Sequence, residues 1–261
     1  MASAEYVRRY YRERMGSRFR GFQASYKETD LWIGVDPASY DGRMEDFAAS
    51  RARSYRLELE SYCARRPEFL SSLAPIADDL SAPKIARVMM AATAAAGVGP
   101  MASVAGAVAD FVGADLDAEF GCREIVVENG GDLWMKFAEA IDAAVFAGTS
   151  PLSGKVGVSI PPELSPLGLC TSSGTVGPSL SLGRADAAMI AARADAAATL
   201  SRAAALADAW ATALGNAVGS EDDIERALDL TAGASGLVSA LVVKGGRMGI
   251  RGELRLKLFS A

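Results

Sequence analysis

An aspartate and a threonine four residues apart are the first pair of groups whose types and spacing could do chemistry. Asp208 and Thr212 lie in the segment ADAWATAL, residues 207–214. In a helix, residues four apart share a face. A carboxylate beside a hydroxyl suits Mg²⁺, which takes few protein oxygens and keeps water or phosphate ligands. In the structural alternative, the aspartate pairs with a basic neighbour or the threonine bonds to its own helix. The spacing alone favours that alternative.

A glycine pair at residues 129–132, Asn-Gly-Gly-Asp, is the second candidate. Two glycines permit positive φ and the close approach of a ligand or of another backbone. A tight turn of the Asn-Gly type between two strands has the same composition. The local sequence therefore favours a hairpin turn over a binding loop.

A loop rich in serine and glycine, GLCTSSGTVGP at residues 168–178, is the third candidate. Its N–H and O–H groups could cradle a phosphate or a pyrophosphate, but it lacks the lysine of a Walker A loop, which excludes that motif. A solvent-exposed loop is an equally good interpretation. Cys170 within it would be reactive if neighbouring donors lowered its pKa, although a buried small side chain is the commoner role.

The small-residue segment GVGPMASVAGAVAD, residues 97–110, is the fourth candidate. Its G-x-G pattern follows a predicted helix instead of a strand, which excludes a dinucleotide-binding fingerprint. A helix that begins there would present free N–H groups to an anion. For most of these residues, close packing through alanine and glycine is the better interpretation.

The composition limits which chemistry is available. The 261 residues include no histidine, which excludes Ser–His and Cys–His catalysis and leaves no imidazole for a zinc site. Three scattered cysteines do not make a disulfide framework. The formal net charge of −5 argues against nucleic acid and against an anionic membrane surface. We see no signal peptide and no uninterrupted apolar run of ~20 residues, so we expect a cytoplasmic protein.

Strands and helices must position these groups. The first half predicts a hairpin at residues 19–26 and 30–35, a helix capped by Asp41 or Asp46 that ends at residue 65, and helices at 83–96 and 101–112. The later predicted elements are strands at 124–128, 133–137, 143–147, 156–160, 169–172 and 185–192, helices at 195–217 and 221–232, and a hairpin at 237–244 and 247–258.

The order of elements is similar in two halves, at about residues 15–160 and 165–261. Each half runs from strands through helices to strands, with no long linker between the halves. We therefore predict an α+β fold made of a duplicated ββααββ unit, in one compact body over residues 1–261. The site would lie between the two units.

Taken in order, six segments resemble the ApbE superfamily, the FAD:protein FMN transferases. They are ETDL at 28–31, GPMASVAGAVADFVG at 99–113, VENGGD at 127–132, SPLSGKVG at 150–157, TSSGTVG at 171–177 and ADAWATALGN at 207–216. The resemblance covers nearly the whole chain and is closest to a short, cytoplasmic branch of archaea and anaerobic bacteria. It implies a tandem T-fold-like arrangement, which agrees with the duplicated unit.

The resemblance also implies a magnesium and flavin site. Asp208 and Thr212 match the superfamily's metal-binding aspartate and threonine, the backbone carbonyl of Ala102 matches a third metal ligand, and Asp208 would also be catalytic. In the superfamily the metal bridges the pyrophosphate of FAD, and FMN passes to a threonine of a partner protein. The implied cofactor-binding residues are Gly99, Met101, Asn129, Gly130, Gly131, Asp132, Thr171, Ser172, Ser173, Gly174 and Thr175.

Two departures from the superfamily pattern bear on FAD. Ala105 stands where the K-G-x-x-x-D segment has lysine, although Gly106 and Asp110 are kept. A later segment with histidine and an Asp-Pro dipeptide is missing. The missing lysine removes a positive charge that could contact the flavin nucleotide, and this counts against FAD or FMN in the superfamily's standard pose.

Three functions are therefore open. The first is an Mg²⁺-dependent enzyme that transfers or hydrolyses a flavin nucleotide, with a protein as acceptor. The second is a non-catalytic protein that binds a small anionic or nucleotide-like ligand. The third is an accessory role in anaerobic sulfur and homocysteine assimilation, with Cys170 as a reactive, catalytic thiol. A homo-oligomer is compatible with each, and neither nucleic acid nor a membrane is expected as a partner.

Overall fold

The computed structural model describes residues 18–173 and 194–259. The first strands form the expected hairpin, in which β1 (Arg20–Tyr26) pairs with β2 (Thr29–Val35). Lys27 has a positive φ of 54° in the turn between them. The helices that follow are α1 (Met44–Arg65), α2 (Pro67–Ser71), α3 (Lys84–Ala96), the 3₁₀ turn η2 (Pro100–Ser103) and α4 (Val104–Phe120).

The rest of the described chain is richer in strands. Its strands are β3 (Ile125–Asn129), β4 (Asp132–Lys136), β5 (Ile141–Ala144), β6 (Val156–Ile160), β7 (Leu167–Ser172), β8 (Ala196–Ser201), β9 (Leu237–Lys244), β10 (Arg247–Gly252) and β11 (Arg255–Leu258). Its helical elements are η3 (Pro162–Leu164), α6 (Ala204–Ala217), η5 (Glu221–Asp223) and α7 (Ile224–Asp229).

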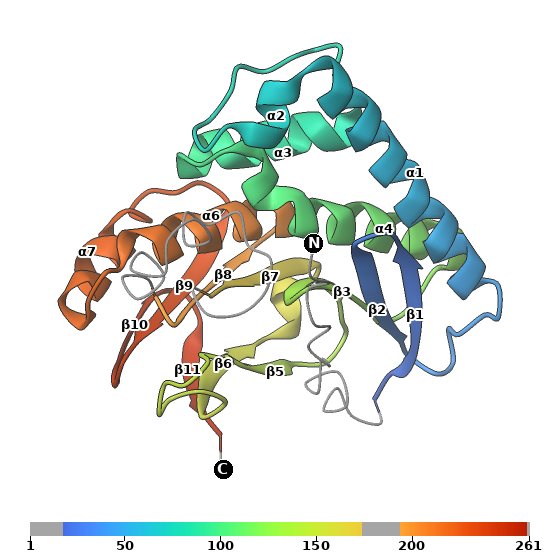
Figure 1. Cartoon of the computed structure of the whole chain (residues 1–261). Coiled ribbons are helices and arrows are strands. Elements are labelled where there is room, and N and C mark those ends of the chain that lie inside the picture. Colours follow the sequence, from blue (N-terminus) through green and yellow to red (C-terminus); the bar gives the residue numbers. More distant parts are fainter. Residues whose placement is uncertain (1–17, 174–193, 260–261) are drawn as a thin grey trace.

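The strands form two antiparallel sheets. The larger has eight strands in the order β1-β2-β3-β4-β7-β8-β9-β10, and the smaller has three in the order β11-β6-β5. The helices lie on one side of the larger sheet, with α4 and α6 directly against it, and the smaller sheet lies on the opposite side (Figure 1). The predicted α+β class and the single compact body are confirmed.

The larger sheet is covered on both faces, and β3 shows this best. All five residues of β3 are buried. Ile125 and Val127 pack in the core beneath the helices, whereas Val126 between them packs in the core shared with the smaller sheet. Because side chains alternate across a strand, a strand with two covered faces has no polar face. This explains the apolar run Ile125–Val127 with which β3 begins.

The predicted long helix at 195–217 is wrong in its first third. Residues Ala196–Ser201 form β8, which pairs with β7 and β9, and the helix α6 begins only at Ala204. Every side chain of β8 is buried. Hydrogen bonds to two neighbouring strands override the high helix propensity of its alanines. The strand expected at 185–192 lies outside the described residues.

Two other elements also differ from the prediction. The last helix of the first half continues past residue 112 to Phe120 and ends at Gly121, which has a positive φ of 64°. The predicted strand at 247–258 divides after Gly252, and β11 leaves the hairpin to pair with β6.

The cap predicted for α1 also differs. The residue that precedes the first turn is Arg43, not Asp41 or Asp46. Asp41 acts two residues earlier, since its carboxylate accepts a hydrogen bond from the backbone N–H of Arg43 at 2.8 Å. The end of α1 at Arg65 is confirmed, and Pro67 opens α2 directly afterwards.

The apolar segment around residues 88–112 forms two core helices, as predicted. Within the described ranges, no single helix has the length and apolar character needed to cross a membrane. α3 and the η2–α4 segment reach that length and character only as a pair bent by 100°. The division of the chain into duplicated halves of the T-fold type stays a prediction.

Candidate functional site

The N-terminal ends of α4 and α6 are each capped by an aspartate of the other helix. Asp110 of α4 accepts hydrogen bonds from the N–H groups of Ala204, at 2.7 Å, and Ala205, at 2.8 Å, which open α6. In return, Asp208 of α6 accepts a hydrogen bond at 2.9 Å from the N–H of Gly106, in the first turn of α4. Each carboxylate satisfies N–H groups that have no acceptor within their own helix.

This reciprocal capping uses the free N–H groups at the start of α4, which the sequence analysis considered as a binding site for an external anion. The N–H of Ala105 also bonds to Asp208, so a carboxylate of the chain itself lies where an anion at the start of α4 would lie. Burial, together with the negative charge of Asp132, raises the pKa of Asp208 well above its usual range. In residues 18–173 and 194–259 no basic side chain forms an ion pair with Asp208. Among the described residues, backbone N–H groups and not a basic side chain therefore hold the carboxylate of Asp208.

Two glycines allow the elements around these caps to approach closely. A Cβ atom on Gly106 would lie 2.3 Å from the carbonyl oxygen of Ala204, and a Cβ atom on Gly168 would lie 2.3 Å from the Cα atom of Ala204. Contacts this short are not tolerated between packed backbones. Gly106 and Gly168 are thus required for α4 and β7 to pack against the start of α6.

The glycine-rich turn at residues 129–132 is a two-residue hairpin loop. Asn129 pairs with Asp132 across β3 and β4, and the two glycines between them have φ of 71° and 105°. Positive φ at both central residues is what a type I′ hairpin turn requires. The side chain of Asn129 donates a hydrogen bond to the carbonyl of Ala105 at 3.1 Å. The turn is therefore tied to the first turn of α4.

Asp132 and Cys170 lie side by side beneath α6. The carboxylate of Asp132 accepts a hydrogen bond from the N–H of Thr171 at 3.3 Å, and the thiol of Cys170 lies next to it. Burial raises the pKa of Asp132 to about 7. A third buried carboxyl, that of Asp110, has its pKa raised to about 6, again chiefly by burial.

The environment of Cys170 is that of a small buried side chain. Its thiol is inaccessible and donates a hydrogen bond to the carbonyl of Ala204 at 3.2 Å. Burial, and then the charge of Asp132, raise the pKa of this thiol. Reactive cysteines need the opposite, an accessible thiol with a lowered pKa. The structure therefore argues against Cys170 as a reactive or catalytic thiol.

The hydroxyl-rich segment after β7 is described only as far as Ser173. The hydroxyl of Ser173 donates to the carbonyl of Asp195 at 2.8 Å. Ser172 faces α6, because a Cβ atom on Gly215 would lie 3.4 Å from its Oγ. Gly174 and Thr175, which were predicted to bind the cofactor, lie outside the described residues.

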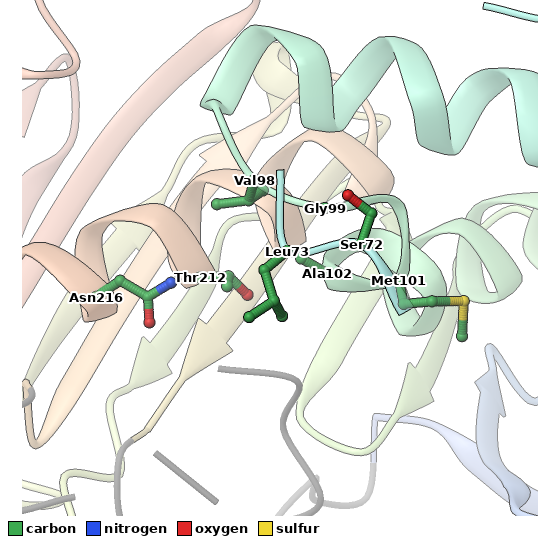
Figure 2. A pocket seen from close by; sticks show the side chains of 8 residues that line it. All are labelled: Ser72, Leu73, Val98, Gly99, Met101, Ala102, Thr212 and Asn216. Carbon is green, nitrogen blue, oxygen red and sulfur yellow. The ribbon is translucent and has the colours of Figure 1, made fainter. Parts of the chain in front are cut away.

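A small pocket lies where α6, η2 and the segment after α2 meet. Figure 2 shows its lining, which consists of Ser72, Leu73, Val98, Gly99, Met101, Ala102, Thr212 and Asn216. The cavity volume is about 30 Å³, which accommodates roughly one or two water-sized groups. None of the lining residues is charged. An anion bound here would therefore need a cation as well.

Four residues singled out in the sequence come together in this pocket. Gly99, Met101 and Ala102 belong to the segment that enters α4, whereas Thr212 comes from α6. Asp208 precedes Thr212 by one turn of the same helix. The residues of the turn at 129–132 and those of 171–173 do not line the pocket.

Sequence reasoning missed the other half of the lining. Asn216 could have been found, because it stands four residues after Thr212 on the same helix face. Ser72 and Leu73 gave no signal, since no motif marks the segment between α2 and α3. The segment nevertheless lies tightly over η2, where a Cβ atom on Gly99 would meet the carbonyl oxygen of Ser72 at 1.9 Å.

Two polar groups in this pocket lack hydrogen-bond partners. Thr212 is only 6 % exposed, and its hydroxyl makes no hydrogen bond within the described part of the chain. Thr93 in α3 behaves differently, because its hydroxyl donates to the carbonyl of Met89 at 2.8 Å. The Oδ1 atom of Asn216 is likewise buried without a partner among the described residues. Of these two groups, only the Oδ1 atom of Asn216 is fully buried, and buried polar groups are nearly always paired, so the pocket is a candidate place for a ligand.

The oxygen atoms around the pocket fit a hard cation better than a soft one. In the described ranges, no group of three or more cysteine, aspartate and glutamate side chains is arranged to hold a metal ion. A cation site here would use the hydroxyl of Thr212 and the carbonyl of Ala102 from the lining, together with the carboxylate of Asp208, which does not line the pocket and precedes Thr212 by one turn of α6. Such a mixed and incomplete oxygen set suits Mg²⁺, which retains several of its waters.

Comparison with known proteins identifies the relatives of this chain. Residues 12–245 match the family described as AbpE bacteria. The chain belongs to this family. It is 38 % identical over 232 residues to the UPF0280 protein of Methanococcus aeolicus, an alignment that covers 86 % of this chain and 88 % of that protein. It is 42 % identical over 193 residues to the UPF0280 protein of Methanosphaerula palustris, with 74 % and 76 % covered.

The fold is shared with a solved flavinyl transferase. The apo crystal structure of Pseudomonas stutzeri flavinyl transferase ApbE superposes on 90 % of this chain and 94 % of its own, with a TM-score of 0.55 and 14 % sequence identity. At this identity the likeness establishes the fold alone. Together with the family match, it confirms the resemblance to the ApbE superfamily that the six segments predicted.

Proposed function

We propose that this chain binds Mg²⁺ through Asp208, Thr212 and the backbone carbonyl of Ala102, and that it acts on a flavin nucleotide, FAD or FMN, through the phosphate groups. The observation that carries the proposal is the hydroxyl of Thr212, which has no hydrogen-bond partner within the described chain and lines a small pocket together with Ala102, one turn of α6 from Asp208. Membership of an ApbE-like family and the fold of a flavinyl transferase support the choice of ligand.

The size of the pocket determines which part of the ligand it could hold. A cavity of about 30 Å³ has room for an ion and a water, not for a flavin dinucleotide. The isoalloxazine and adenine rings would therefore lie outside it, with the phosphates at its mouth. When bound, the cation supplies charge neutralisation to phosphate oxygens and orients them for in-line displacement.

The side chains of this protein would contribute position and charge. Asp208 offers its carboxylate while the N–H of Gly106 fixes the orientation of that carboxylate. Asp110 fixes the start of α6 and hence the direction in which Asp208 and Thr212 point. Ala105 contributes no charge where a lysine would, so the neutralisation of an anionic ligand would depend more strongly on the cation.

A turnover assay tests the proposal directly. The chain is incubated with FAD and Mg²⁺ and the products are separated by chromatography, first alone and then with a candidate acceptor protein. We expect FMN and AMP, or FMN attached to the acceptor, and loss of both with Asp208→Asn and with EDTA. If neither turnover nor binding of FAD is seen with Mg²⁺ present, the proposal is wrong.

A non-catalytic binding protein is the second candidate, and Ala105 favours it. Without the lysine, the site retains oxygens for a cation but lacks a fixed positive charge that could stabilise a transition state. A thermal-shift screen of flavins and nucleotides with Mg²⁺ separates the two candidates. Stabilisation by FAD or another nucleotide without product formation would favour binding alone. The accessory role that requires a reactive Cys170 has no support from its buried position.

A further inference from the structure

The amide group of Asn216 lies in the pocket, and the sequence patterns assign it no role. Asn216 follows Thr212 by four residues on α6, and both residues line the pocket. Figure 2 shows that the nitrogen of this amide, and not its oxygen, is turned toward Thr212. Neither atom of the amide has a hydrogen-bond partner in the part of the chain that the structure describes. The amide therefore presents an unused donor on the side of Thr212.

The hydroxyl oxygen of Thr212 is the side-chain acceptor that this donor faces. Among the described residues no hydrogen bond joins the two side chains, and in the proposed site this oxygen binds the cation. The hydroxyl of Ser72 is already used, since it donates to the carbonyl of Ala74 at 2.7 Å and accepts the N–H of the same residue at 3.2 Å. The remaining lining residues have no polar side chain, and they are Leu73, Val98, Gly99, Met101 and Ala102. The amide nitrogen is thus left for an oxygen of the ligand.

A donor next to a cation ligand fits a phosphate group. An amide N–H cannot bind a cation, but it bonds strongly to an oxygen that carries negative charge. A phosphate presents several such oxygens, so one can bind Mg²⁺ while another accepts a hydrogen bond from a neighbouring donor. The cavity of about 30 Å³ has room for a cation and a single oxygen, with the rest of the phosphate at its mouth.

The alanine at position 105 makes this donor more important. The superfamily pattern has a lysine there, and none of the residues that line the pocket is charged. The cation would then supply the neutralising charge, but a cation alone does not fix the direction in which a phosphate points. A directional donor on the opposite side of the phosphate supplies that orientation.

We propose that the amide nitrogen of Asn216 donates a hydrogen bond to a phosphate oxygen of the ligand, next to the phosphate oxygen that binds Mg²⁺. This inference rests on the proposed function, since it presumes a cation at Asp208 and Thr212. It extends that function by naming the side chain that orients the phosphate. It holds for a flavin nucleotide and for any other ligand with a phosphate or pyrophosphate group, because these offer the same oxygens.

Calorimetric titration of inorganic pyrophosphate into the purified chain at saturating Mg²⁺ tests the inference without any nucleotide. Asn216→Leu has similar size and no donor. We expect it to weaken pyrophosphate binding by about tenfold or more, which is the usual effect of a lost hydrogen bond to a charged group. The affinity for Mg²⁺ alone should change by less than about twofold, because the amide nitrogen does not contact the cation.

Asn216→Asp is the second variant. It keeps the shape of the side chain but places a carboxylate oxygen where the donor was, so we expect pyrophosphate binding at saturating Mg²⁺ to weaken by about a hundredfold. Ala232→Asp adds the same charge at an exposed position beyond α7 and should leave pyrophosphate binding unchanged. If Asn216→Leu does not fold, this pair of aspartate variants decides.

The contrast between Mg²⁺ and pyrophosphate separates this role from two others. Loss of a merely structural asparagine would weaken the binding of Mg²⁺ and of pyrophosphate together, in step with a fall in thermal stability. An amide oxygen that faced the cation would give a different pattern. Asn216→Leu would then weaken the binding of Mg²⁺ alone, and Asn216→Asp would leave pyrophosphate binding intact. Either pattern overturns the inference.

The remaining outcomes distinguish failure here from failure of the proposed function. If the unchanged chain binds Mg²⁺ and pyrophosphate and both variants at Asn216 do so equally well, this inference is wrong while the cation site at Asp208 and Thr212 stands. If pyrophosphate binding depends on Asn216 but FAD is neither bound nor turned over, the inference holds and the assignment of a flavin nucleotide is wrong. If the unchanged chain binds neither Mg²⁺ nor pyrophosphate, both the site and the inference are wrong.

Discussion

The two halves of helix α6 differ in how their polar groups are satisfied. In the first half, the N–H groups of Ala204 and Ala205 bond to Asp110, and the carboxylate of Asp208 accepts the N–H of Gly106. In the second half, the hydroxyl of Thr212 and the buried Oδ1 atom of Asn216 have no hydrogen-bond partner within the described chain, and the same holds for the buried Nε1 atom of Trp210 at the middle of the helix. The first half fixes how α4 and α6 pack against each other, whereas the second half is where we propose that a ligand binds.

Asp208 stands at the boundary between these halves. It caps α4, and it is also the carboxylate proposed to hold a cation. Substitution of Asp208 cannot distinguish the two roles, because its loss would affect folding and ligand binding together. Substitutions of residues that share only one of these roles can distinguish the effect on stability from the effect on binding.

The largest effect should come from the close contact at the start of the helices. Gly106→Ala would place a Cβ atom 2.3 Å from the carbonyl oxygen of Ala204 and 2.9 Å from the Cβ atom of Asp208. We expect it to lower the free energy of unfolding by about 3 kcal/mol, as overpacking of a tight core does. Chemical denaturation measures this. Gly42→Ala is the control, because its Cβ atom would meet nothing within 4 Å.

Removal of the cap on α6 should have the next largest effect. Asp110→Ala leaves the N–H groups of Ala204 and Ala205 without acceptors, and we expect a loss of about 2 kcal/mol in the free energy of unfolding. Asp41→Ala, which removes an exposed carboxylate before α1, should cost about 0.5 kcal/mol. Equal losses in the two variants would contradict the role of Asp110 as a buried cap.

The free energy of unfolding should depend on pH, because ionisation of a buried carboxyl group destabilises the folded chain. Burial raises the pKa of Asp132 to about 7, so the folded chain retains a proton there that the unfolded chain releases near pH 4. The contribution of Asp132 to stability is therefore fully present below about pH 4 and is lost as pH rises to about 7. Denaturation of Asp132→Asn should give a flatter profile over this window, by at least about 1 kcal/mol.

Asp222→Asn serves as the control for this profile. Its carboxylate is 89 % exposed, so its removal should leave the pH profile unchanged. A profile for Asp132→Asn that runs parallel to that of the unchanged chain would show that Asp132 loses its proton at an ordinary pH. The buried region around Asp132, beneath α6, would then be more hydrated than its packing indicates.

The smallest effect on stability should come from Thr212, although its effect on binding should be large. Thr212→Val removes a hydroxyl that has no partner within the described chain, so we expect the free energy of unfolding to change by less than about 0.5 kcal/mol. Mg²⁺ binding should be lost. Thr93→Val is the matched variant, because it removes a hydroxyl bonded to its own helix. It should cost about 1 kcal/mol and leave Mg²⁺ binding unchanged.

The opposite result would reverse the assignment of the second half of α6. If Thr212→Val destabilises the chain as much as Thr93→Val and leaves Mg²⁺ binding intact, Thr212 is a structural residue. The contrast between the two halves of the helix would then reflect packing alone.

Short-range patterns in the sequence were sufficient for several elements. The strands β6 and β9 occur at the predicted residues, and the hairpins β1–β2, β3–β4 and β9–β10 occur at the predicted turns. Each is specified by alternation of apolar residues and by a local turn. The end of α1 was equally predictable, because Pro67 follows within two residues.

Elements that depend on distant partners were not predictable in this way. The alanine-rich segment of β8 favours a helix by propensity, and only its place between β7 and β9 makes it a strand. The departure of β11 to the smaller sheet has the same origin, since its partner β6 lies about a hundred residues earlier. Propensity describes a residue and its neighbours in sequence, whereas sheet pairing depends on contacts that the sequence does not display.

For the site, the sequence by itself determined the chemical types and the shared helix face. The spacing of Asp208 and Thr212 places them on one side of α6. The absence of histidine excludes catalysis by an imidazole, and the six segments indicate the family. The tertiary structure decided which polar groups already have hydrogen-bond partners within the chain. Capping by Asp110, burial of Cys170, and the pocket closed by Ser72 and Leu73 all arise from contacts between distant segments. Whether a polar group is satisfied depends on those contacts, and only the folded chain brings them together.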